Sequence, residues 1–320
     1  MNIGLDIMGG DYAPEAAVKG ALLFLENNTN PDIRLTLIGN KDIVASLMQP
    51  LEPYKAAFDF VHAPSVIEMN EHPTKALKEK QDSSIAIGFG LLLHKKIDAF
   101  LSAGNTGAML VGAMYTVKAI DGVLRPTIAS PIPSIQNHTN FLLDVGANAD
   151  CKPEHLVQFA EMGSLYVQHV LKVENPRIGL LNIGEEEGKG NILAQSTYPL
   201  LKTHQDLNFV GNIEGRDLFT NQCDVTVCEG FAGNVILKLA ESFYDIFAVS
   251  KGIKDELLDR FNYESYGGTP ILGVNAPVII GHGISKASVF KEMINESVKI
   301  VSSNLIPILQ QHFSKQIQLS

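Results

Sequence analysis

The stretch that decides the fold is Ile97-Asp98-Ala99-Phe100-Leu101-Ser102-Ala103-Gly104-Asn105-Thr106-Gly107. An apolar strand at 97–101 runs directly into a turn of small and polar residues at 102–107. A helical pattern then continues to about Ala119. This order of strand, turn and helix predicts an α/β protein.

The same junction recurs along the chain. Strands are expected at 3–7, 97–101, 141–145, 178–183, 225–228 and 277–280. The turns that follow them are 8–11, 102–107, 146–148, 184–191, 229–234 and 281–285. Apolar strands that alternate with helices predict a largely parallel sheet covered on both faces. Ligands bind at the carboxyl ends of such strands, so we expect the six turns to converge on one cleft.

Three further elements are expected outside these junctions. A helix begins at Pro14 and Glu15 and runs to about Leu25. A short strand at 127–130 precedes Pro131 and Pro133, which suggests a sheet edge or a connection between lobes. Residues 235–261 form two amphipathic helical stretches, broken near 250–252.

Bulk properties exclude several classes of protein. The 320 residues are 45% hydrophobic with a formal net charge of -10, so the chain is globular and its charge argues against nucleic-acid binding. Three cysteines without a CxxC pair argue against a disulfide framework and a structural zinc site. No signal-type start and no apolar run of about 20 residues are present. We therefore expect a protein of the reducing cytoplasm.

Two turns have the composition of anion sites. The turn 102–107 combines backbone N–H groups with the side chains of Ser102, Asn105 and Thr106, although a capped strand–helix turn needs the same residues. In Gly188-Lys189-Gly190-Asn191, a cation stands between glycines that allow close backbone approach. Its alternative is a solvated, flexible charged loop after three glutamates.

Other polar residues at strand ends have two interpretations each. Asn234 could orient a substrate oxygen or stabilise an oxyanion, or it could be a helix N-cap. Cys228 fits a buried apolar position better than a nucleophile. Four aspartates could bind a metal or act as a base, but caps and turns account for most such residues: Asp6, Asp11, Asp144 and Asp150. His282 is an acid or donor, or a turn histidine bonded to backbone.

Several well-known signatures are missing from the chain. There is no GxGxxG after a strand, and no GxxxxGK[ST], GxSxG or HExxH. These gaps disfavour a P-loop nucleotide hydrolase, a serine hydrolase and a zinc protease.

Taken together in order, the turn sequences resemble one family, the bacterial phosphate acyltransferases of fatty-acid and phospholipid synthesis (the PlsX family). The resembling blocks span nearly the whole chain: 6–11, 102–108, 125–126, 142–148, 180–190, 211–217, 230–234, 272–274 and 279–283. The family often has Ala where Ile7 stands and Asp where Glu229 stands, which puts any catalytic role of Glu229 in doubt while keeping its carboxylate.

The resemblance implies a three-layer α/β/α sandwich with a mostly parallel, mixed sheet, similar to isocitrate and isopropylmalate dehydrogenases and to phosphotransacetylases. It implies one catalytic unit over 1–320, which two lobes around a cleft could form, and a homodimer. The implied reaction moves a fatty acyl group from acyl-acyl-carrier-protein to inorganic phosphate, which gives acyl phosphate for phospholipid synthesis. It requires no cofactor and no metal.

Roles follow from this reaction and from the loop chemistry. Lys189 would bind phosphate or the oxyanion, Asn234 would orient the acyl carbonyl, and Asp144 and Glu229 would position the lysine or accept a proton. The remaining expected phosphate- or substrate-binding residues are Ser102, Gly104, Asn105, Thr106, Gly107, Asn182, Gly188, Gly190, Asn191, Gly233 and His282.

Rival functions remain open at this point. A short-chain phosphotransacetylase would use coenzyme A as donor, and a decarboxylating dehydrogenase would need a metal. A non-catalytic scaffold would bind lipid through the amphipathic segment 235–266. In the enzyme, 235–249 fits a core or dimer helix better, whereas 253–266 is equally a candidate for dimer contact or peripheral membrane contact. An acidic carrier protein would need a basic patch, for which Lys78, Lys80, Lys95 and Lys96 are candidates.

Overall fold

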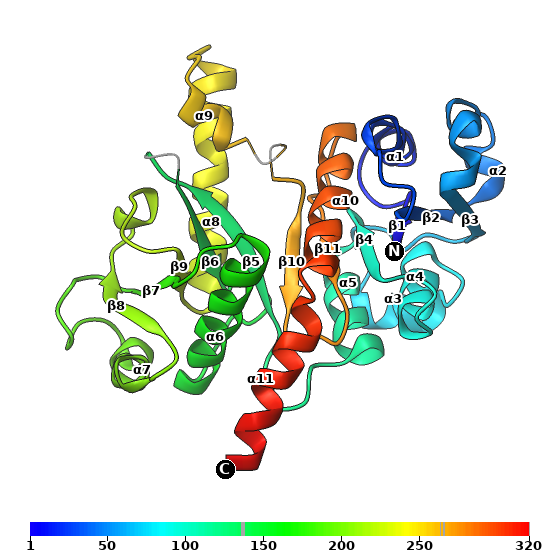
Figure 1. The fold of residues 1–320 in the computed structure, drawn as a ribbon. Helices are drawn as coiled ribbons and strands as arrows, with labels where there is room; N and C mark the ends of the chain where they lie inside the picture. The colour runs from blue at the N-terminus through cyan, green and yellow to red at the C-terminus, as the bar shows by residue number, and fades with distance from the viewer. Residues whose placement is uncertain (136–137, 263, 265, 320) are drawn as a thin grey trace. The chain divides into compact units, whose positions relative to one another are not determined.

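A computed structural model describes residues 1–135, 138–262, 264 and 266–319 of the chain. The chain divides into two compact units. Unit 1 comprises Met1–Ala119 and Glu264–Ser302, and unit 2 comprises Ile120–Tyr263 and Ser303–Ser320. Each unit has its own sheet and helices, shown in Figure 1.

The sheet of unit 1 is mainly parallel. Its strand order is β3 (Phe58–His62), β2 (Arg34–Gly39), β1 (Asn2–Asp6), β4 (Ala99–Ser102), β11 (Val278–Ile280) and β10 (Thr269–Leu272). The pairs β1–β2, β1–β4 and β4–β11 are parallel, whereas β10 is antiparallel to β11. Strand β4 is buried along its whole length because helices α4 and α10 both contact it.

The helices of unit 1 bury one apolar stripe each. Helix α1 (Glu15–Asn27) pairs with α10 (Ala287–Ser302), and α10 also contacts β1, β4 and β11. Helix α4 (Ser84–Leu93) contacts β1, β2 and β4, and its Phe89 ring meets Phe100 of β4 edge-on. The smaller elements are α2 (Lys41–Val44), η1 (Gln49–Ala57), α3 (Pro73–Glu79), α5 (Thr106–Gly112) and η2 (Ala113–Val117).

Unit 2 repeats this plan. Its strand order is β5 (Thr127–Pro133), β6 (Thr139–Leu143), β9 (Val225–Val227), β7 (Arg177–Leu181) and β8 (Asn208–Ile213). All its pairs are parallel except β5–β6. Its helical elements are α6 (Pro153–Val170), α7 (Ile192–Thr203), η3 (Asp217–Phe219), α8 (Gly230–Phe243), η4 (Tyr244–Ser250), α9 (Glu256–Arg260) and α11 (Leu305–Leu319).

The predicted α/β class and mixed sheet are confirmed, with strand bounds one or two residues from those expected. The helix after 102–107 ends at Val117. The strand expected at 127–130 continues to Pro133, and both Pro131 and Pro133 lie opposite β6. The break expected near 250–252 separates η4 from α9, but α9 has only five residues and begins after Ile253.

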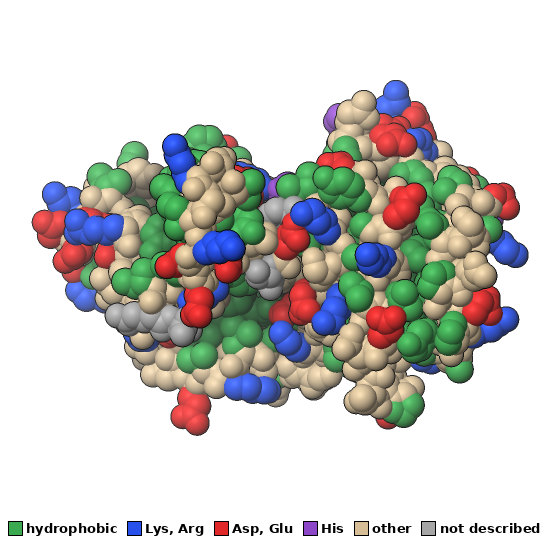
Figure 2. Space-filling model, turned by 90° about the horizontal axis from the view of Figure 1, so that it is seen from above, with side chains coloured by type: hydrophobic (Ala, Val, Ile, Leu, Met, Phe, Trp, Pro, Cys, Tyr) green, Lys and Arg blue, Asp and Glu red, His purple; other side chains and the backbone are tan. Residues whose placement is uncertain are grey.

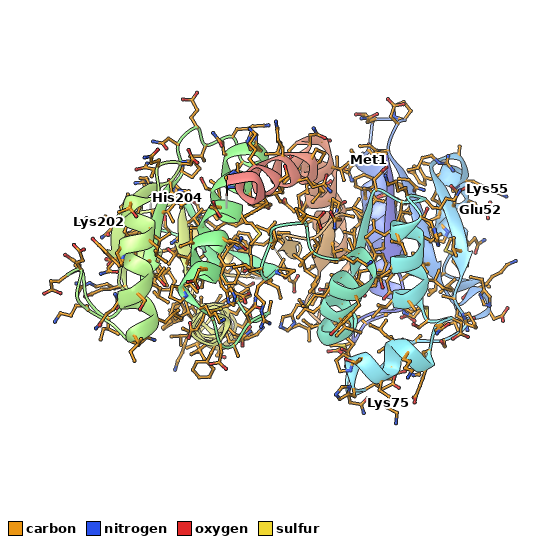
Figure 3. The ribbon with its side chains drawn as sticks, turned by 90° about the horizontal axis from the view of Figure 1, so that it is seen from below. Met1, Glu52, Lys55, Lys75, Lys202 and His204 are labelled. Atoms are coloured by element: carbon orange, nitrogen blue, oxygen red, sulfur yellow. The ribbon has the colours of Figure 1, made fainter. Side chains whose placement is uncertain are left out.

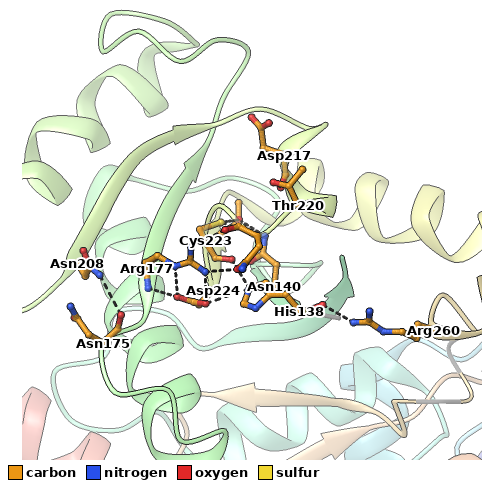
Figure 4. A network of polar contacts seen from close by, with 12 residues as sticks. His138, Asn140, Asn175, Arg177, Asn208, Asp217, Thr220, Cys223, Asp224 and Arg260 are labelled. Carbon is orange, nitrogen blue, oxygen red and sulfur yellow. Dashed lines mark hydrogen bonds and ion pairs between the residues drawn. The ribbon is translucent and has the colours of Figure 1, made fainter. Parts of the chain in front are cut away.

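Arg260, the last residue of α9, and the following residue, Phe261, hold this helix against the rest of unit 2. Arg260 donates to the carbonyl oxygen of Ser134 at 2.9 Å and to that of His138 at 2.6 Å, the second of which is drawn in Figure 4. Phe261 is buried between the rings of Phe219 and Phe243, with centroids 5.7 and 5.6 Å away. The amphipathic spacing placed Phe261 on an apolar face. In the structure this face packs against the protein, so the side chain of Phe261 is not available to contact lipid.

Figure 4 also shows an ion pair where β7 and β9 begin. Two side-chain nitrogens of Arg177 lie 3.0 Å from the carboxylate of Asp224, and its backbone N–H donates at 2.6 Å. Burial alone raises the pKa of Asp224, but the Arg177 guanidinium outweighs it and holds that pKa below its usual range. The pair fixes the edge of the sheet opposite the turns.

A buried carboxylate joins three helices of unit 2. Glu161 of α6 is 2% exposed, and its Oε1 lies 3.1 Å from Nε2 of His204 and 3.0 Å from Nε2 of His312 on α11. Figure 3 places His204 at the end of α7, near Lys202. The hydrogen bond to Glu161 raises the pKa of His204. His204 Nδ1 accepts from the backbone N–H of Asp206, so the ring proton is on Nε2. Nε2 therefore donates a hydrogen bond to Glu161, which joins the end of α7 to α6.

Candidate functional site

The six predicted turns fall into two sets of three, one set in each unit. In unit 1 they follow β1, β4 and β11, and β4 pairs in parallel with both of the others. In unit 2 they follow β6, β9 and β7, and β9 is the central strand. Parallel neighbours end at the same edge of a sheet, so each set gathers at one edge of its own unit.

Asp6 and Ser102 join the first two turns of unit 1. Ser102 Oγ donates to Asp6 Oδ2 at 2.7 Å and accepts from the backbone N–H of Gly104 at 2.9 Å. Asp6 Oδ1 accepts from the backbone N–H of Met8 at 2.9 Å. Both side chains are 0% exposed, and burial raises the pKa of Asp6. Ser102 is therefore a buried structural residue that holds the turn by hydrogen bonds, and its side chain is not presented to a ligand.

The three turns of unit 1 touch one another. A Cβ added to Gly9 would lie 2.5 Å from the backbone N of Gly104, so only glycine permits this approach. The backbone N–H of Asp11 donates to the carbonyl oxygen of Gly283 at 2.7 Å. The sequence therefore placed these three turns together correctly.

Asn105 uses its amide for structure. Its Oδ1 accepts from the backbone N–H of Ala108 at 2.9 Å and so caps α5, while Nδ2 donates to the carbonyl oxygens of Glu68 and Glu71 at 2.9 and 3.0 Å. The next residue, Thr106, is exposed at the start of the helix. Asn105 is therefore a helix cap. The part of the turn that faces outward is Thr106 together with the backbone around Gly107.

His282 is exposed in the third turn of unit 1. Its Nδ1 faces the backbone N–H of Ile284 at 3.5 Å, and its carbonyl oxygen accepts from Ser285 Oγ. The ring thus participates in its own turn.

Asp144 organises the first turn of unit 2. Its Oδ1 accepts from the backbone N–H groups of Ile128, Gly146 and Ala147 at 3.1, 3.3 and 3.1 Å. Its Oδ2 accepts from the backbone and the side-chain amide of Asn148 at 2.6 and 2.9 Å. Burial raises the pKa of Asp144, and these donors oppose that effect. With five donors around it, the carboxylate holds the turn in place.

The turn after β9 packs directly on that aspartate. A Cβ on Gly233 would lie 1.9 Å from the carbonyl oxygen of Asp144, and the backbone N–H of Gly230 donates to Asn148 O at 2.7 Å. Glu229 caps α8, because its Oε1 accepts from the backbone N–H of Ala232 at 3.1 Å. The N-cap alternative for Asn234 is therefore wrong, since the helix begins four residues earlier at Gly230.

The two polar side chains of this turn differ in exposure. Asn234 is exposed, and its Nδ2 donates to Val145 O at 2.9 Å, which leaves the second N–H of the same amide for a ligand. Glu229 is half-buried, and burial raises its pKa, although the hydrogen bond from Ala232 opposes this. Cys228 behind them is buried, which raises the pKa of its thiol well above the usual value and disfavours a thiolate nucleophile.

Side-chain amides hold the backbone of the lysine loop, residues 182–191, where its two ends approach each other. Asn182 Nδ2 donates to Lys189 O at 3.1 Å, and Gln195 Nε2 donates to the carbonyl oxygens of Gly188 and Gly190 at 3.1 and 3.0 Å. Gly190 has φ +93°, and a Cβ there would lie 2.3 Å from Asn182 Oδ1. Asn191 caps α7 through Ala194 N–H at 2.9 Å.

Each glutamate of the acidic run in this loop faces a cation. Glu185 lies 3.8 Å from Arg216, Glu186 lies 4.0 Å from Lys189, and Glu187 lies 2.8 Å from Lys202. Exposed pairs contribute little one by one, about 0–1 kcal/mol each. The amide contacts to the loop backbone, rather than these pairs, hold the loop in one conformation, which argues against the flexible-loop alternative. The Lys189 side chain is 52% exposed, so its ammonium is accessible.

Two supporting residues received no role from the sequence: Gln195, which holds the lysine loop, and Asn212, whose Nδ2 donates to Glu186 O at 2.9 Å. A third, Asp6, was considered as a metal ligand or a base, and the structure shows that it accepts a hydrogen bond from Ser102 instead. Asp6 and Asn212 stand at or near the ends of apolar strands and inside blocks already recognised, so their position was a usable signal. Gln195 lies within a helix and carries no such signal.

The described residues contain no group of three or more His, Cys, Asp or Glu arranged to hold a metal ion. Among the same residues, no helix has both the length and the apolar content to span a bilayer. On the face seen in Figure 2, Lys and Arg side chains lie among Asp and Glu, with hydrophobic side chains between them.

Comparison with known proteins identifies what the chain is similar to. A family model described as "Fatty acid synthesis protein" matches residues 1–257. The phosphate acyltransferase of Dictyoglomus turgidum is 44% identical, with 94% of each chain covered. The phosphate acyltransferase of Halothermothrix orenii is 42% identical, with 98% of this chain and 99% of the relative covered.

Solved structures share the fold at low identity. A phosphotransacetylase from Streptococcus pyogenes superposes with a TM-score of 0.65 at 15% identity, covering 96% of this chain and 94% of the other. A branched-chain phosphotransacylase from Enterococcus faecalis gives 0.61 at 14% identity, covering 94% and 99%. These likenesses show that the α/β architecture is that of phosphotransacylases.

Proposed function

We propose, from the premise that this chain belongs to the fatty acid synthesis protein family, that it transfers a fatty acyl group from the thioester of acyl carrier protein to inorganic phosphate. Its relatives at 39–44% identity are named phosphate acyltransferase over nearly their full length, so the chain is an acyltransferase that uses phosphate. The observation that carries the proposal is the accessible ammonium of Lys189 on a loop fixed by three amides.

In the proposed reaction, phosphate is the nucleophile. A phosphate oxygen attacks the thioester carbonyl carbon, the C–O bond forms, and the C–S bond breaks as the carrier thiolate leaves and takes a proton. No side chain needs to form a covalent intermediate, in keeping with the burial of Cys228. What the enzyme must supply is position and stabilisation of the tetrahedral oxyanion.

The roles of individual residues follow from their geometry. Lys189 would bind phosphate or the oxyanion with a charge-assisted hydrogen bond. Asn234 would orient the acyl carbonyl through the N–H that Val145 does not use. Thr106 and the backbone from Gly104 to Ala108 would contact phosphate, with Ser102 and Asn105 holding that turn from behind.

The two carboxylates would have different tasks. Asp144 is saturated by five donors, so we assign it to positioning the turn that supports Asn234. Burial raises the pKa of both carboxyls. Glu229 is only half-buried and its Oε1 accepts from the backbone N–H of Ala232, whereas Asp144 is fully buried among five donors. Glu229 is therefore the more accessible proton acceptor. A raised pKa brings a carboxylate closer to the working pH, where a general base is most effective.

Product analysis tests the proposal. With hexadecanoyl-acyl-carrier-protein and phosphate, we expect acyl phosphate and free carrier thiol in equal amounts. The matched donor is acetyl-coenzyme A, which a short-chain phosphotransacetylase would prefer. Acetyl phosphate as the main product would replace the proposal with that rival, and nicotinamide reduction that a chelator abolishes would favour the dehydrogenase.

We also propose a role for the exposed apolar side chains of α8, of η4 and of the residues that follow η4. Val235 and Leu239 on α8 are 53% and 57% exposed, and Val249 and Ile253 near the end of the segment are 65% and 47% exposed. Apolar stripes of this kind mark protein or membrane contacts. We assign the α8 part to a homodimer, and we leave 253–266 to dimer or membrane contact; Tyr263 of that segment lies outside the described residues.

Two charged variants separate these contacts. Leu239→Glu should convert a dimer to a monomer in sedimentation, because a buried carboxylate without a partner is costly at an interface. Ile253→Glu should lower flotation with anionic liposomes, and Ser250→Glu is the control that adds the same charge at an exposed polar position. Unchanged sedimentation and unchanged flotation in the two variants would argue against both contacts.

A further inference from the structure

A groove of about 260 Å³ lies in unit 1 between α3, α4 and the continuous helix α5–η2. We propose that this groove binds the fatty acyl tail of the thioester donor. The identity of that donor rests on the function proposed above. The location of the groove, its lining and its relation to the turn 103–107 are independent observations.

The groove is apolar inside and fixed at its base. Its lining includes Leu77, Ala86, Phe89 and Val111. Phe89 is 1% exposed and meets Phe100 of β4 edge-on, with ring centroids 5.1 Å apart. The base is therefore anchored to the core sheet, and it presents carbon atoms to whatever enters.

A glycine lets the helix approach this base closely. A Cβ on Gly112 would lie 2.1 Å from the ring of Phe89, so any larger residue would displace the ring. Next along the helix, Tyr115 is 74% exposed and stands at the rim of the groove. An aromatic ring with so much exposed surface is poised to cover an apolar ligand.

The groove and the turn 103–107 are built from the same two helices. Asn105 fixes the carbonyl groups of Glu68 and Glu71, which lead into α3, and a Cβ on Gly107 would lie 2.3 Å from Pro73, the first residue of α3. Figure 3 labels Lys75 on this helix. The groove-lining stretch 111–116 is five to ten residues beyond Thr106, or about 8–15 Å along the axis at 1.5 Å per residue.

A thioester donor has this shape. Its carbonyl must lie beside phosphate, and a flexible apolar chain of variable length extends from it. A donor whose carbonyl lies near Thr106 would lay its chain along α5 into the groove, where each buried methylene adds about fourfold to binding. The polar lining residues Thr74 and Lys78 stand at the rim of the groove. The base, which Phe89 forms, is apolar and does not favour a charged ligand.

Groove filling tests the proposal in the full-length protein. For Ala86→Phe, the value of kcat/KM for hexadecanoyl-acyl-carrier-protein should fall at least about tenfold relative to that for hexanoyl-acyl-carrier-protein. Leu93→Phe is the matched control, because Leu93 lies on the same helix, is 52% exposed and does not line the groove. An equal loss for both chain lengths, or none, would overturn the proposal.

A second variant and a second readout cover the remaining outcomes. Should Ala86→Phe fail to fold, Tyr115→Ala changes only an exposed rim residue and should selectively weaken use of the hexadecanoyl donor. A hexadecanoyl thioester with a terminal diazirine should cross-link to peptides 74–89 or 111–116, independent of turnover. Labels elsewhere would refute the groove even in an active enzyme. Labels in the groove without acyl phosphate would instead refute the proposed function.

Discussion

Replacing Lys189 with alanine should lower kcat/KM for phosphate by about a hundredfold to a thousandfold, which corresponds to about 2.7–4 kcal/mol of lost transition-state stabilisation. The reason is that Lys189 is the cation that the lysine loop presents, with its side chain half exposed and its backbone fixed by Asn182. Removal of an ammonium that contacts a dianion or an oxyanion removes an interaction that no neighbouring neutral group replaces. Initial rates at varied phosphate measure the effect.

The control for this variant is Lys202, a lysine of α7 that forms an ion pair with a glutamate of the lysine loop. Lys202→Ala removes the ion pair with Glu187, whose side chains are both 56% exposed, and should cost turnover little by comparison. The free energy of unfolding of both variants should lie within about 0.5 kcal/mol of the wild-type value, as expected for surface positions. Lys189→Ala that keeps turnover within threefold of the wild type would remove this residue from the proposed mechanism.

The strand–turn–helix order and the grouping of the turns could be predicted from the sequence. Strand β4 is continuous in apolar residues, and the small residues after it allow a tight turn, so local sequence carries the information. Strand β2 was not predicted as part of a junction because a single residue, Asn40, separates it from α2. Strand β8 was also missed, since Gly211 interrupts its apolar pattern and has φ +106°.

The exact partners of polar residues could not be predicted. The cations that face Glu185 and Glu187 are Arg216 and Lys202, which are distant in the sequence and meet the loop only after folding. The cap of α8 was misplaced because glutamate is an unusual N-cap, whereas Asn234 is of a preferred type. Residue type thus predicted the chemistry available at each turn, while its use depended on tertiary contacts.

Asp6 and Asp144 show how the two units solve the same problem. Each lies at the end of a strand, is fully buried, and accepts from the backbone of the turn that follows. Burial raises the pKa of each carboxyl, so each would be an unfavourable group without its donors. We infer that these aspartates are architectural, and that the residues in contact with substrate stand on the turns they support.

The second large effect is expected at Gly233. Alanine there would place its Cβ 1.9 Å from the carbonyl oxygen of Asp144, far inside contact distance. That carbonyl has little room to move, because the backbone N–H of Asp144 donates to Cys228 O at 3.0 Å and its carboxylate holds five donors. Alanine favours a helix by about 1 kcal/mol over glycine, so the collision must exceed that gain before any loss of stability is seen.

We expect Gly233→Ala to lower the free energy of unfolding by about 3 kcal/mol or more, at the upper end for overpacking of a buried site. Urea denaturation followed by circular dichroism gives the midpoint. The matched variant is Gly215→Ala, since Gly215 is exposed in a turn and a Cβ there meets nothing within 4 Å. It should stay within about 0.5 kcal/mol of the wild type. Equal midpoints for the two variants would mean that the turn after β9 does not pack on Asp144, and the support proposed for Asn234 would be lost with it.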